Sequence, residues 1–345
     1  MPEVPPVPLA ELTTLRLGGA ARRLIEATSE AELVDTVRSC DAAGEPLLVL
    51  GGGSNLVVAD EGFDGTVVAV RTRGVDHGGD SCGGTTVTVA AGEHWDDVVA
   101  DVVQRGLVGL EALSGIPGST GAVPVQNVGA YGQEVAQTIA TVRTWDRQAA
   151  RQRTFANGDC GFAYRWSRFK AEPQRYVVLE VTFQLLRGDL AAPVEYAELA
   201  RRLGIELGQR APLGDVRSAV LELRRGKGMV LDAGDHDTWS AGSFFTNPVL
   251  DAEAAARLPE DAPRWDQPDG SVKTSAAWLI GATGFTKGHA HGGVALSDKH
   301  LLALTNRGSG TTAELVGLAR EVRDAVAERF GIVLVNEPVT VGCEL

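Results

Sequence analysis

Cysteine pairs at metal-ligand spacing are absent from this 345-residue chain. Its cysteines, Cys40, Cys82, Cys160 and Cys343, are widely separated and form no Cys-x-x-Cys motif. Disulfide frameworks belong mainly to short secreted chains, whereas a chain of this length usually keeps such cysteines reduced. We therefore expect free thiols in a reducing compartment.

Long apolar runs and an excess of positive charge are also missing. No segment approaches membrane-spanning length, and the N-terminus has no basic region followed by an apolar one, so we expect neither a membrane span nor a signal peptide. The 32 lysines and arginines against 45 aspartates and glutamates give a net charge of −13. This charge opposes binding to nucleic acid or to an anionic membrane. We expect a cytoplasmic protein that binds neither.

The composition is otherwise that of a folded protein with many turns. Hydrophobic residues make up 44% and charged residues 22% of the chain, which is ordinary for a globular protein. A chain of 345 residues is expected to form two or three domains. Because glycine is costly inside helices and strands, the 42 glycines predict numerous turns or backbone held close to a ligand.

Periodicity and capping signals predict a mixture of helices and strands. Capping boxes at Ser29–Glu32 and Thr311–Glu314 begin two helices, and the second continues to about residue 330 before Gly331. Strict alternation of apolar residues over 176–185 predicts a strand with one buried face. The remaining predicted elements are strands at 47–50, 66–70, 85–91 and 332–335, and helices at 95–105 and 216–225. This mixture indicates an α+β fold in at least two domains.

Two glycine-rich segments are candidates for ligand binding. The first, residues 51–55, follows the strand 47–50, where exposed backbone N–H groups can bind an anion, although such a segment is more often only a turn. It is not a dinucleotide-binding fingerprint, because Leu56 stands where that motif needs glycine, and no P-loop motif occurs. The second segment, 114–132, mixes glycines and prolines with apolar residues. It is either a tight structural loop or a chain held against a flat polar ligand.

These segments and several others resemble one family, in that family's order. GGGSN at 51–55 and GIPGSTGAVPVQNVGAYG at 115–132 resemble the two FAD-contacting segments of the UDP-N-acetylenolpyruvoylglucosamine reductases, also called UDP-N-acetylmuramate dehydrogenases. The resemblance extends to FAYRWSRFK at 162–170, GSFFTNP at 242–248, DGSVKTSAAWLI at 269–280 and NEPV at 336–339. It covers the chain from about Thr14 to Glu337.

The resemblance implies a fold and a cofactor. The implied fold is an FAD-binding module of the vanillyl-alcohol-oxidase type in two subdomains, 1–65 and 66–205, the second joined by a C-terminal strand at 332–345. An α+β substrate-binding domain would occupy 206–331. Neither glycine segment contains histidine or cysteine, so we expect FAD to be bound without a covalent link. The implied cofactor contacts are Gly51, Gly52, Gly53, Ser54, Asn55, Gly115, Gly118, Ser119, Gly121, Gln126, Asn127, Gly129 and Ala130.

The activity implied by the family is reduction of the enolpyruvyl ether of UDP-N-acetylglucosamine to UDP-N-acetylmuramate, in peptidoglycan precursor synthesis. NADPH would reduce the flavin, and hydride from flavin N5 would add to C3 of the enolpyruvyl group. Because negative charge then accumulates on the carboxylate side, the site must stabilise it with fixed donors and protonate C2. The expected partners are NADPH and the sugar nucleotide, and we expect a monomer.

Three residues match the family's catalytic positions. Arg165 would bind the substrate carboxylate, Glu337 would hydrogen-bond the enolate, and Ser243 would deliver the proton to C2. Without the family, Arg165 is a surface arginine, Glu337 an exposed strand end and Ser243 a turn residue. The matches to substrate-holding positions are Tyr164, Tyr196, Asn247 and, more loosely, Lys227. Tyr196 is otherwise an apolar position of a helix.

Other functions are weighed against this one. His289, His291, Asp298 and His300 could suggest a metal site, but they lack the second pair typical of zinc. We expect a polar loop that faces the substrate and no metal, and we assign the residues of this region no individual roles. Another flavin oxidoreductase, such as an oxidase of small alcohols, would need no proton donor like Ser243. A non-catalytic flavin or nucleotide-sugar binding protein would need none of the three catalytic residue types.

Overall fold

The computed structural model describes residues 7–81 and 84–345. Contacts divide these residues into two compact units. Unit 1 combines the described part of Met1–Ala20 with Ser54–Phe63 and Lys227–Leu345. Unit 2 combines Ala21–Gly53 with Asp64–Gly226. Each unit is described separately below.

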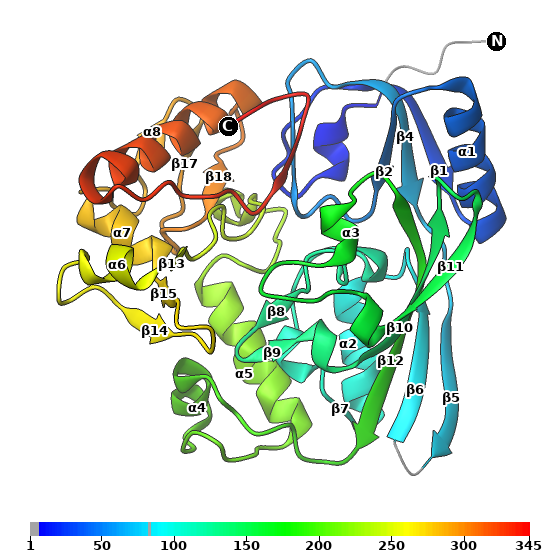
Figure 1. The fold of residues 1–345 in the computed structure, drawn as a ribbon, viewed down its shortest axis with the longest axis horizontal. Coiled ribbons are helices and arrows are strands. Elements are labelled where there is room, and N and C mark those ends of the chain that lie inside the picture. The colour runs from blue at the N-terminus through cyan, green and yellow to red at the C-terminus, as the bar shows by residue number, and fades with distance from the viewer. Residues whose placement is uncertain (1–6, 82–83) are drawn as a thin grey trace. The chain divides into compact units, whose positions relative to one another are not determined.

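A small α/β layer contains the first glycine segment of unit 2. Strands β1 (Ala21–Ala27), β4 (Phe63–Val70) and β2 (Leu47–Leu50) form a three-stranded sheet in that order, with β2 parallel to β4. Helix α1 (Glu30–Ala43) contacts β1 and β2 (Figure 1). Ser29 and Glu32 form the predicted capping box at its start. The predicted order of helix, strand and glycine segment is confirmed.

The larger sheet of unit 2 is antiparallel. Its order is β11 (Arg151–Ala156), β10 (Ile139–Asp146), β12 (Tyr176–Arg187), β6 (Gly84–Ala90) and β5 (Val75–Ser81), and β7 (Leu107–Val108) also pairs with β12. Tyr176, Val177 and Val178 are all buried, and the predicted alternation is confirmed from Leu179 onward, because Leu179, Val181, Phe183 and Leu185 are buried. Between them, Glu180, Thr182 and Gln184 are partly exposed.

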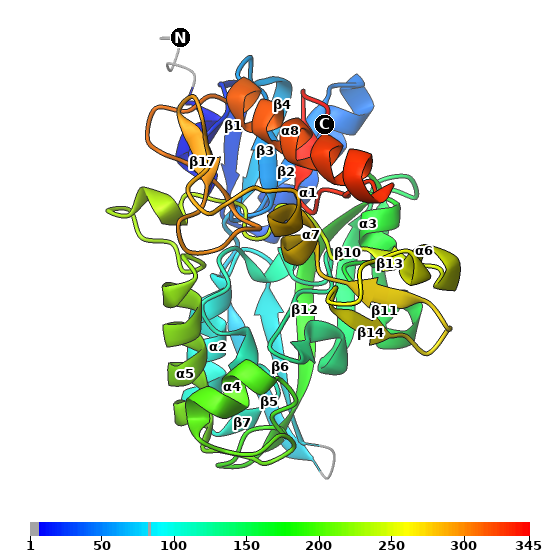
Figure 2. The ribbon, with the colours of Figure 1, turned by 90° about the vertical axis from the view of Figure 1, so that its left-hand side faces the viewer.

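Helices cover the buried face of this sheet. Trp95, the first residue of α2 (Trp95–Gln104), is fully buried and its ring centre lies 5.8 Å from that of Phe183. The helix stops just before Gly106, whose φ of 68° favours glycine, as predicted. Figure 2 shows α5 (Leu213–Gly226) beside α2 and α4 (Ala197–Leu203), and both pairs are in contact. The remaining short elements of unit 2 are η2 (Glu111–Leu113), η3 (Thr120–Ala122), β8 (Gly129–Ala130), β9 (Gln133–Glu134), η4 (Val135–Gln137), η5 (Asn157–Asp159) and α3 (Arg168–Ala171).

Unit 1 is built from short strands and helices around a separate core. Its sheets have the orders β13 (Val249–Leu250), β15 (Val272–Thr274), β14 (Arg264–Asp266), then β16 (Ala290–His291), β17 (Val294–Leu296), β18 (Leu304–Asn306), and the pair β3 (Leu56–Val58) with β19 (Val339–Val341). Its other elements are η1 (Leu9–Leu12), η6 (His236–Thr238), α6 (Ala252–Ala256), α7 (Ala276–Ala282) and α8 (Thr312–Phe330). The predicted capping box of Thr311 and Glu314 begins α8, and Gly331 ends it. Figure 2 shows α8 next to β17, and the two are in contact.

The end of the chain corrects one prediction. Residues 332–335 were expected to form a strand, but the strand is β19, which runs parallel to β3. Residues 332–335 are extended with alternating burial, since Ile332 is 7% and Val333 65% exposed. Val335 O accepts hydrogen bonds from Thr246 N at 3.0 Å and from Thr246 Oγ1 at 3.3 Å, but residues 332–335 belong to none of the strand ladders in the described part of the chain. Alternating apolar residues therefore produced an extended chain without the ladder that defines a strand.

The units differ from the predicted domain ranges. The last boundary between the two compact units lies between residues 226 and 227, whereas the substrate-binding domain was expected to begin at residue 206. The C-terminal strand was expected to join residues 66–205, but its partner β3 lies within 1–65. The division into three domains stays a prediction.

Two further observations concern properties expected from composition. Cys40, Cys160 and Cys343 are free thiols, and Cys82 lies outside the described residues. Of the helices in the described ranges, none combines the length and the apolar character that crossing a bilayer requires.

Candidate active site

The two glycine segments of unit 2 lie against each other. A Cβ atom added to Gly52 would lie 2.5 Å from Gly118 Cα and 3.1 Å from Ser119 N, and one added to Gly51 would collide with Ser119 Oγ. Because carbon atoms that do not share a bond stay about 3.5–4.0 Å apart, Gly52 leaves no space for any side chain. The segments 51–53 and 115–132, distant in sequence, therefore form one backbone surface.

The first of these segments presents unused donors. Among the described residues, none accepts a hydrogen bond from the backbone N–H groups of Gly51, Gly52 or Gly53. Gly53 has φ 63°, a left-handed conformation that glycine adopts at little cost. Backbone N–H groups in such a turn can bind an anion. This arrangement is suited to a phosphate group at the end of β2.

The second segment is fixed to the start of α2. Gly118 O accepts a hydrogen bond from Trp95 N at 3.1 Å, and Gly115 N donates to Asp96 Oδ1 at 2.6 Å. Asp96 also receives two hydrogen bonds from Arg217 of α5, at 2.7 and 2.9 Å. Burial alone would raise the pKa of Asp96, but the hydrogen bonds from Arg217 and Gly115 outweigh it and lower that pKa. Asp96 is therefore a carboxylate at neutral pH and anchors the segment.

The predicted contacts Gln126 and Asn127 use their side chains within the protein. Asn127 is 1% exposed, and its Nδ2 donates to Glu134 Oε2 at 2.8 Å and to Ala163 O at 3.0 Å. Its Oδ1 accepts from Ala136 N at 3.1 Å. Gln126 Oε1 accepts from Lys170 Nζ at 2.8 Å. For Asn127, contact with a ligand is thus left to the backbone.

Arg165, in unit 2, occupies a tight turn in a strained conformation. Ala163 and Trp166 close the turn with N–H to O bonds of 3.1 and 3.0 Å, and Arg165 between them has φ 51°. A positive φ in a residue other than glycine costs about 1–2 kcal/mol. Arg165 Nη2 donates to Gly129 O in the second glycine segment at 2.9 Å, and its guanidinium lies 5.3 Å from the Tyr164 ring centre. Strain of this kind is typical of a residue whose direction matters for function.

Tyr196, also in unit 2, precedes α4 and is not within its apolar stripe. It is the N-cap residue of that helix and is 42% exposed. Its ring lies edge-on to Tyr131 of the second glycine segment, with 5.3 Å between centres. Burial raises the pKa of Tyr131 to about 12 and lowers that of Arg224 to about 10. Tyr131 is therefore a neutral phenol, and Arg224 a cation, at pH 7.

Ser243 and Glu337, both in unit 1, are held on neighbouring extended segments. Phe244, which follows Ser243, accepts a hydrogen bond from Glu337 N at 2.8 Å. Phe245 and Asn336 form a bridge beside this bond. Asn55 donates its Nδ2 to Glu337 O at 3.3 Å. Two residues that sequence reasoning selected from motifs far apart along the chain are thus brought together, and Asn55 is connected to them.

The other predicted substrate residues of unit 1 have different surroundings. Asn247 Oδ1 accepts a hydrogen bond from Ala276 N at 3.0 Å, at the start of α7. Lys227 directly follows α5 and is partly exposed. One further residue lies at the site, because His300 Nε2 is 3.3 Å from Ser243 Oγ. Sequence reasoning missed this contact, and no local signal around His300 points to it.

The other two histidines that could have suggested a metal site, His289 and His291, contact a carboxylate of helix α8. His289 Nε2 and His291 Nδ1 lie 3.1 and 3.2 Å from the two carboxylate oxygens of Glu321. Across the described ranges, no group of three or more histidine, cysteine, aspartate or glutamate side chains is arranged to hold a metal ion.

Comparison with protein families identifies both parts of the chain. The model of an FAD binding domain matches residues 21–153. The model of the C-terminal domain of UDP-N-acetylenolpyruvoylglucosamine reductase matches residues 234–341.

Curated relatives are similar over nearly the whole chain. The UDP-N-acetylenolpyruvoylglucosamine reductase of Streptomyces avermitilis is 57% identical, covering 99% of this chain and 96% of the relative. That of Cutibacterium acnes is 56% identical, covering 98% and 90%. Among solved structures, UDP-N-acetylenolpyruvylglucosamine reductase from Thermus caldophilus matches with a TM-score of 0.66 at 24% identity, over 97% of each chain. This last similarity concerns the fold.

Proposed function

The chain belongs to the UDP-N-acetylenolpyruvoylglucosamine reductase family, and we propose that it carries out that family's reaction. It is an FAD-dependent oxidoreductase of peptidoglycan precursor synthesis, with an α+β fold that contains an FAD-binding module of the vanillyl-alcohol-oxidase type. The substrate is the enolpyruvyl ether of UDP-N-acetylglucosamine, and the product is UDP-N-acetylmuramate. NADPH is the reductant, and the protein acts in the cytoplasm as a monomer.

The residues of unit 2 fit FAD. The N–H groups of Gly51, Gly52 and Gly53 suit its pyrophosphate, because they are donors on a backbone surface that no side chain obstructs. The second glycine segment, 115–132, would lie along the isoalloxazine ring, and its anchoring through Asp96 keeps that path fixed. Neither segment contains a nucleophilic histidine or cysteine, which supports non-covalent binding. When bound, FAD supplies the hydride that reduces the substrate, after its own reduction by NADPH.

Ser243 and Glu337 are proposed to handle the proton and the developing charge. Ser243 holds the proton that reaches C2, and Glu337 hydrogen-bonds the enolate oxygen. Their proximity supports this pairing, since the backbone bond between Glu337 N and Phe244 O fixes one segment relative to the other. Phe244 and Phe245 are each 1% exposed, so both segments are anchored in the core.

Arg165 is proposed to bind the substrate carboxylate. A guanidinium stays charged and can donate two parallel hydrogen bonds to a carboxylate. The turn at 163–166 holds the backbone of Arg165, and the bond from Nη2 to Gly129 O holds its guanidinium, which supports a fixed direction. A charge that is already oriented before substrate arrives stabilises the enolate without reorganisation.

Four further residues are proposed to hold the sugar nucleotide. Tyr196, on an exposed position before α4, would close over the nucleotide, and Lys227 would contact the diphosphate. Asn247 and Tyr164 would contact the substrate beside Ser243 and Arg165 respectively. We also retain the three-domain division of 1–65, 66–205 and 206–331 as part of the proposal.

One observation carries the proposal, namely the joining of two glycine segments into a single backbone surface in a chain of this family. The test is an anaerobic titration of the purified protein. It should be yellow, NADPH should bleach the visible absorbance of the flavin, and the enolpyruvyl sugar nucleotide should restore that absorbance. A colourless protein, or a bleached protein that the sugar nucleotide does not reoxidise, would refute the proposal.

A further inference from the structure

A tight turn between β17 and β18 carries His300 to Ser243. Ser297 N donates to Ala303 O at 2.8 Å, and Ala303 N donates to His300 O at 3.0 Å. Inside the turn, Ser297 Oγ accepts hydrogen bonds from Lys299 N and His300 N, both at 3.0 Å. These bonds determine the backbone of His300 directly.

A buried carboxylate anchors this turn. Asp237 is 5% exposed. It accepts hydrogen bonds from Ser297 Oγ at 2.8 Å and Asp298 N at 2.9 Å, and it forms an ion pair with Arg307 at 3.1 Å. Because a buried carboxylate with these partners is costly to displace, the turn is a rigid support.

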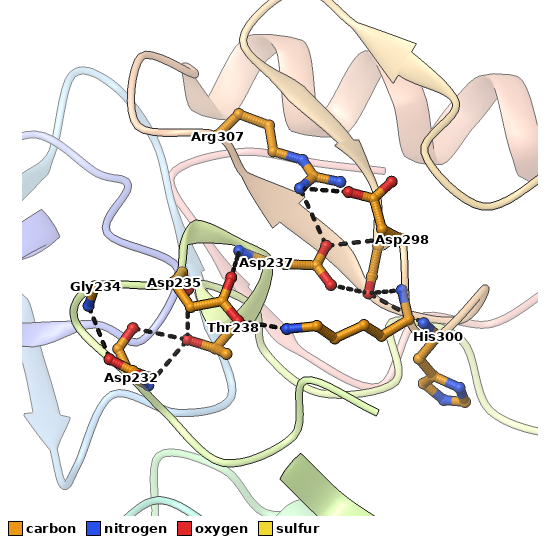
Figure 3. Close-up of polar contacts among 10 residues, drawn as sticks. Asp232, Gly234, Asp235, Asp237, Thr238, Asp298, His300 and Arg307 are labelled. Carbon is orange, nitrogen blue, oxygen red and sulfur yellow. Dashed lines mark hydrogen bonds and ion pairs between the residues drawn. The ribbon is translucent and has the colours of Figure 1, made fainter. Parts of the chain in front are cut away.

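The charged neighbours of His300 in the turn are engaged with other groups. Lys299 forms an ion pair with Asp235, and Asp298 forms one with Arg307 at 3.1 Å. Figure 3 shows the His300 ring directed away from the carboxylates of Asp237 and Asp298. The ring is therefore the part of this network that extends toward Ser243.

Ser243 is fixed to the same turn by its own backbone. Phe244 N donates to Leu302 O at 2.7 Å, and Leu302 lies two residues beyond His300. The distance of 3.3 Å between His300 Nε2 and Ser243 Oγ is thus set at both ends by main-chain bonds. Two flexible side chains that met by chance would lack this common frame.

We propose that His300 is a positioning residue for Ser243, donating a hydrogen bond from Nε2–H to Oγ. This inference rests on the proposed function, in which the Ser243 hydroxyl gives its proton to C2. A serine that gives its proton to substrate must direct that hydrogen at the substrate. The bond with the ring must then be donated by the ring, which requires the tautomer or charge state with hydrogen on Nε2.

The same bond stabilises the charge that forms on Ser243. As the Oγ–H bond breaks, a C–H bond forms at C2 and the electron pair remains on Oγ. The Nε2–H group, already directed at Oγ, stabilises that negative charge until a proton from solvent restores the hydroxyl. An isolated serine is a poor acid at neutral pH, and His300 supplies the assistance that Ser243 requires.

The test compares two replacements of similar size in the complete holoenzyme. His300→Gln keeps an N–H donor, whereas His300→Met removes it. Each enzyme is reduced anaerobically with NADPH and then mixed with the enolpyruvyl sugar nucleotide, and the rates of both half-reactions are recorded. His300→Leu replaces His300→Met if the latter does not yield a folded flavoprotein.

The expected result is a selective loss in the second half-reaction. In His300→Met the limiting rate of flavin reoxidation should fall about tenfold to a hundredfold, which is less than the roughly 10²–10³ lost with a donor that contacts a substrate oxyanion directly, because His300 acts through Ser243. Flavin reduction by NADPH and the substrate concentration at half-saturation should change less than about threefold, and His300→Gln should recover most of the rate. In a Ser243→Ala background, His300→Met should have no further effect, because its action passes through Ser243.

Other outcomes separate this inference from the proposed function. If Ser243→Ala is slow but His300→Met reoxidises at the wild-type rate, the inference is wrong and the proposed function stands. The inference is also wrong if His300→Met slows both half-reactions equally, or slows the Ser243→Ala enzyme further. If Ser243→Ala itself reoxidises normally, the proton-donor role fails and the inference fails with it.

Discussion

Replacing Gly52 with alanine should separate the two glycine segments and weaken FAD binding. The added Cβ would lie 2.5 Å from Gly118 Cα and 2.9 Å from Gly118 C. Both neighbours are backbone atoms, so no side-chain rotation relieves the collision. One segment must move by about 1 Å to restore an ordinary carbon–carbon contact.

The free-energy cost of the Gly52→Ala collision can be estimated. Overpacking of this kind costs about 1–3 kcal/mol. If this free energy destabilises the conformation that binds FAD, the dissociation constant of FAD should rise about tenfold to a hundredfold, since 1.4 kcal/mol corresponds to a factor of ten. The φ of Gly52 is outside the left-handed region, so the effect is purely steric.

The assay is FAD titration of apoprotein, followed by flavin fluorescence, together with thermal unfolding of the same samples. Gly158→Ala is the control, because its Cβ meets no atom within 4 Å and its φ is unstrained. Gly51→Ala provides a second test. Its collision is with Ser119 Oγ, a side-chain atom that can rotate away, so Gly51→Ala should weaken FAD binding less than Gly52→Ala does. Wild-type affinity in Gly52→Ala would refute the described approach of the segments.

Three other predictions concern catalysis and stability. Ser243→Ala should leave flavin reduction by NADPH intact while turnover falls by about two orders of magnitude, the effect of a lost general acid; equal slowing of both half-reactions would contradict it. Arg165→Lys should slow flavin reoxidation by the sugar nucleotide about tenfold or more, because lysine cannot donate in parallel to a carboxylate; wild-type reoxidation kinetics would argue against that role. Asp146→Asn should lower the free energy of unfolding by about 1–3 kcal/mol at pH 7, since Arg175 loses the buried one of its two charged acceptors and keeps only Glu172. The hydrogen bond from Arg175 lowers the pKa of Asp146 in the folded protein. The stabilisation of the folded state by this carboxylate is therefore fully present above the pKa of an unfolded aspartate, about 3.9, and is lost as the pH falls through the lower pKa of the folded state. Denaturant titrations should therefore show the difference between wild type and variant shrinking below about pH 4, and a difference that grew in acid would be inconsistent.

Local signals in the sequence predicted local structure well. The capping boxes at Ser29 and Thr311 are both present, and from Leu179 onward the alternation predicted in 176–185 is a one-sided burial pattern. Each of these features depends on residues a few positions apart, so it can be read without knowing the tertiary fold. The prediction of a strand at 332–335 was wrong because a strand also needs a partner strand, and residues a few positions apart do not reveal whether one is present.

The site residues remain predictions, and the contacts among them could not be predicted from the sequence. The motifs that contain Ser243 and Glu337 were visible, whereas their connection through Phe244 depends on tertiary pairing. The contact of His300 with Ser243 joins positions separated by 57 residues and has no periodic signature. Asn127 was assigned to the cofactor, yet its amide holds the Ala163 turn, a task that composition cannot reveal.

The parallel pairing of β3 with β19 has a consequence for biosynthesis. The two strands are far apart along the chain, and a ribosome adding about 5–20 residues per second needs roughly 15–60 s to make the second after the first. Unit 2 ends at Gly226 and can complete its core during this interval. Glu337 lies just before β19, so it is synthesised only at the end of this interval. The nascent protein can therefore acquire its flavin-binding surface well before it acquires Glu337 and the pairing of β19 with β3.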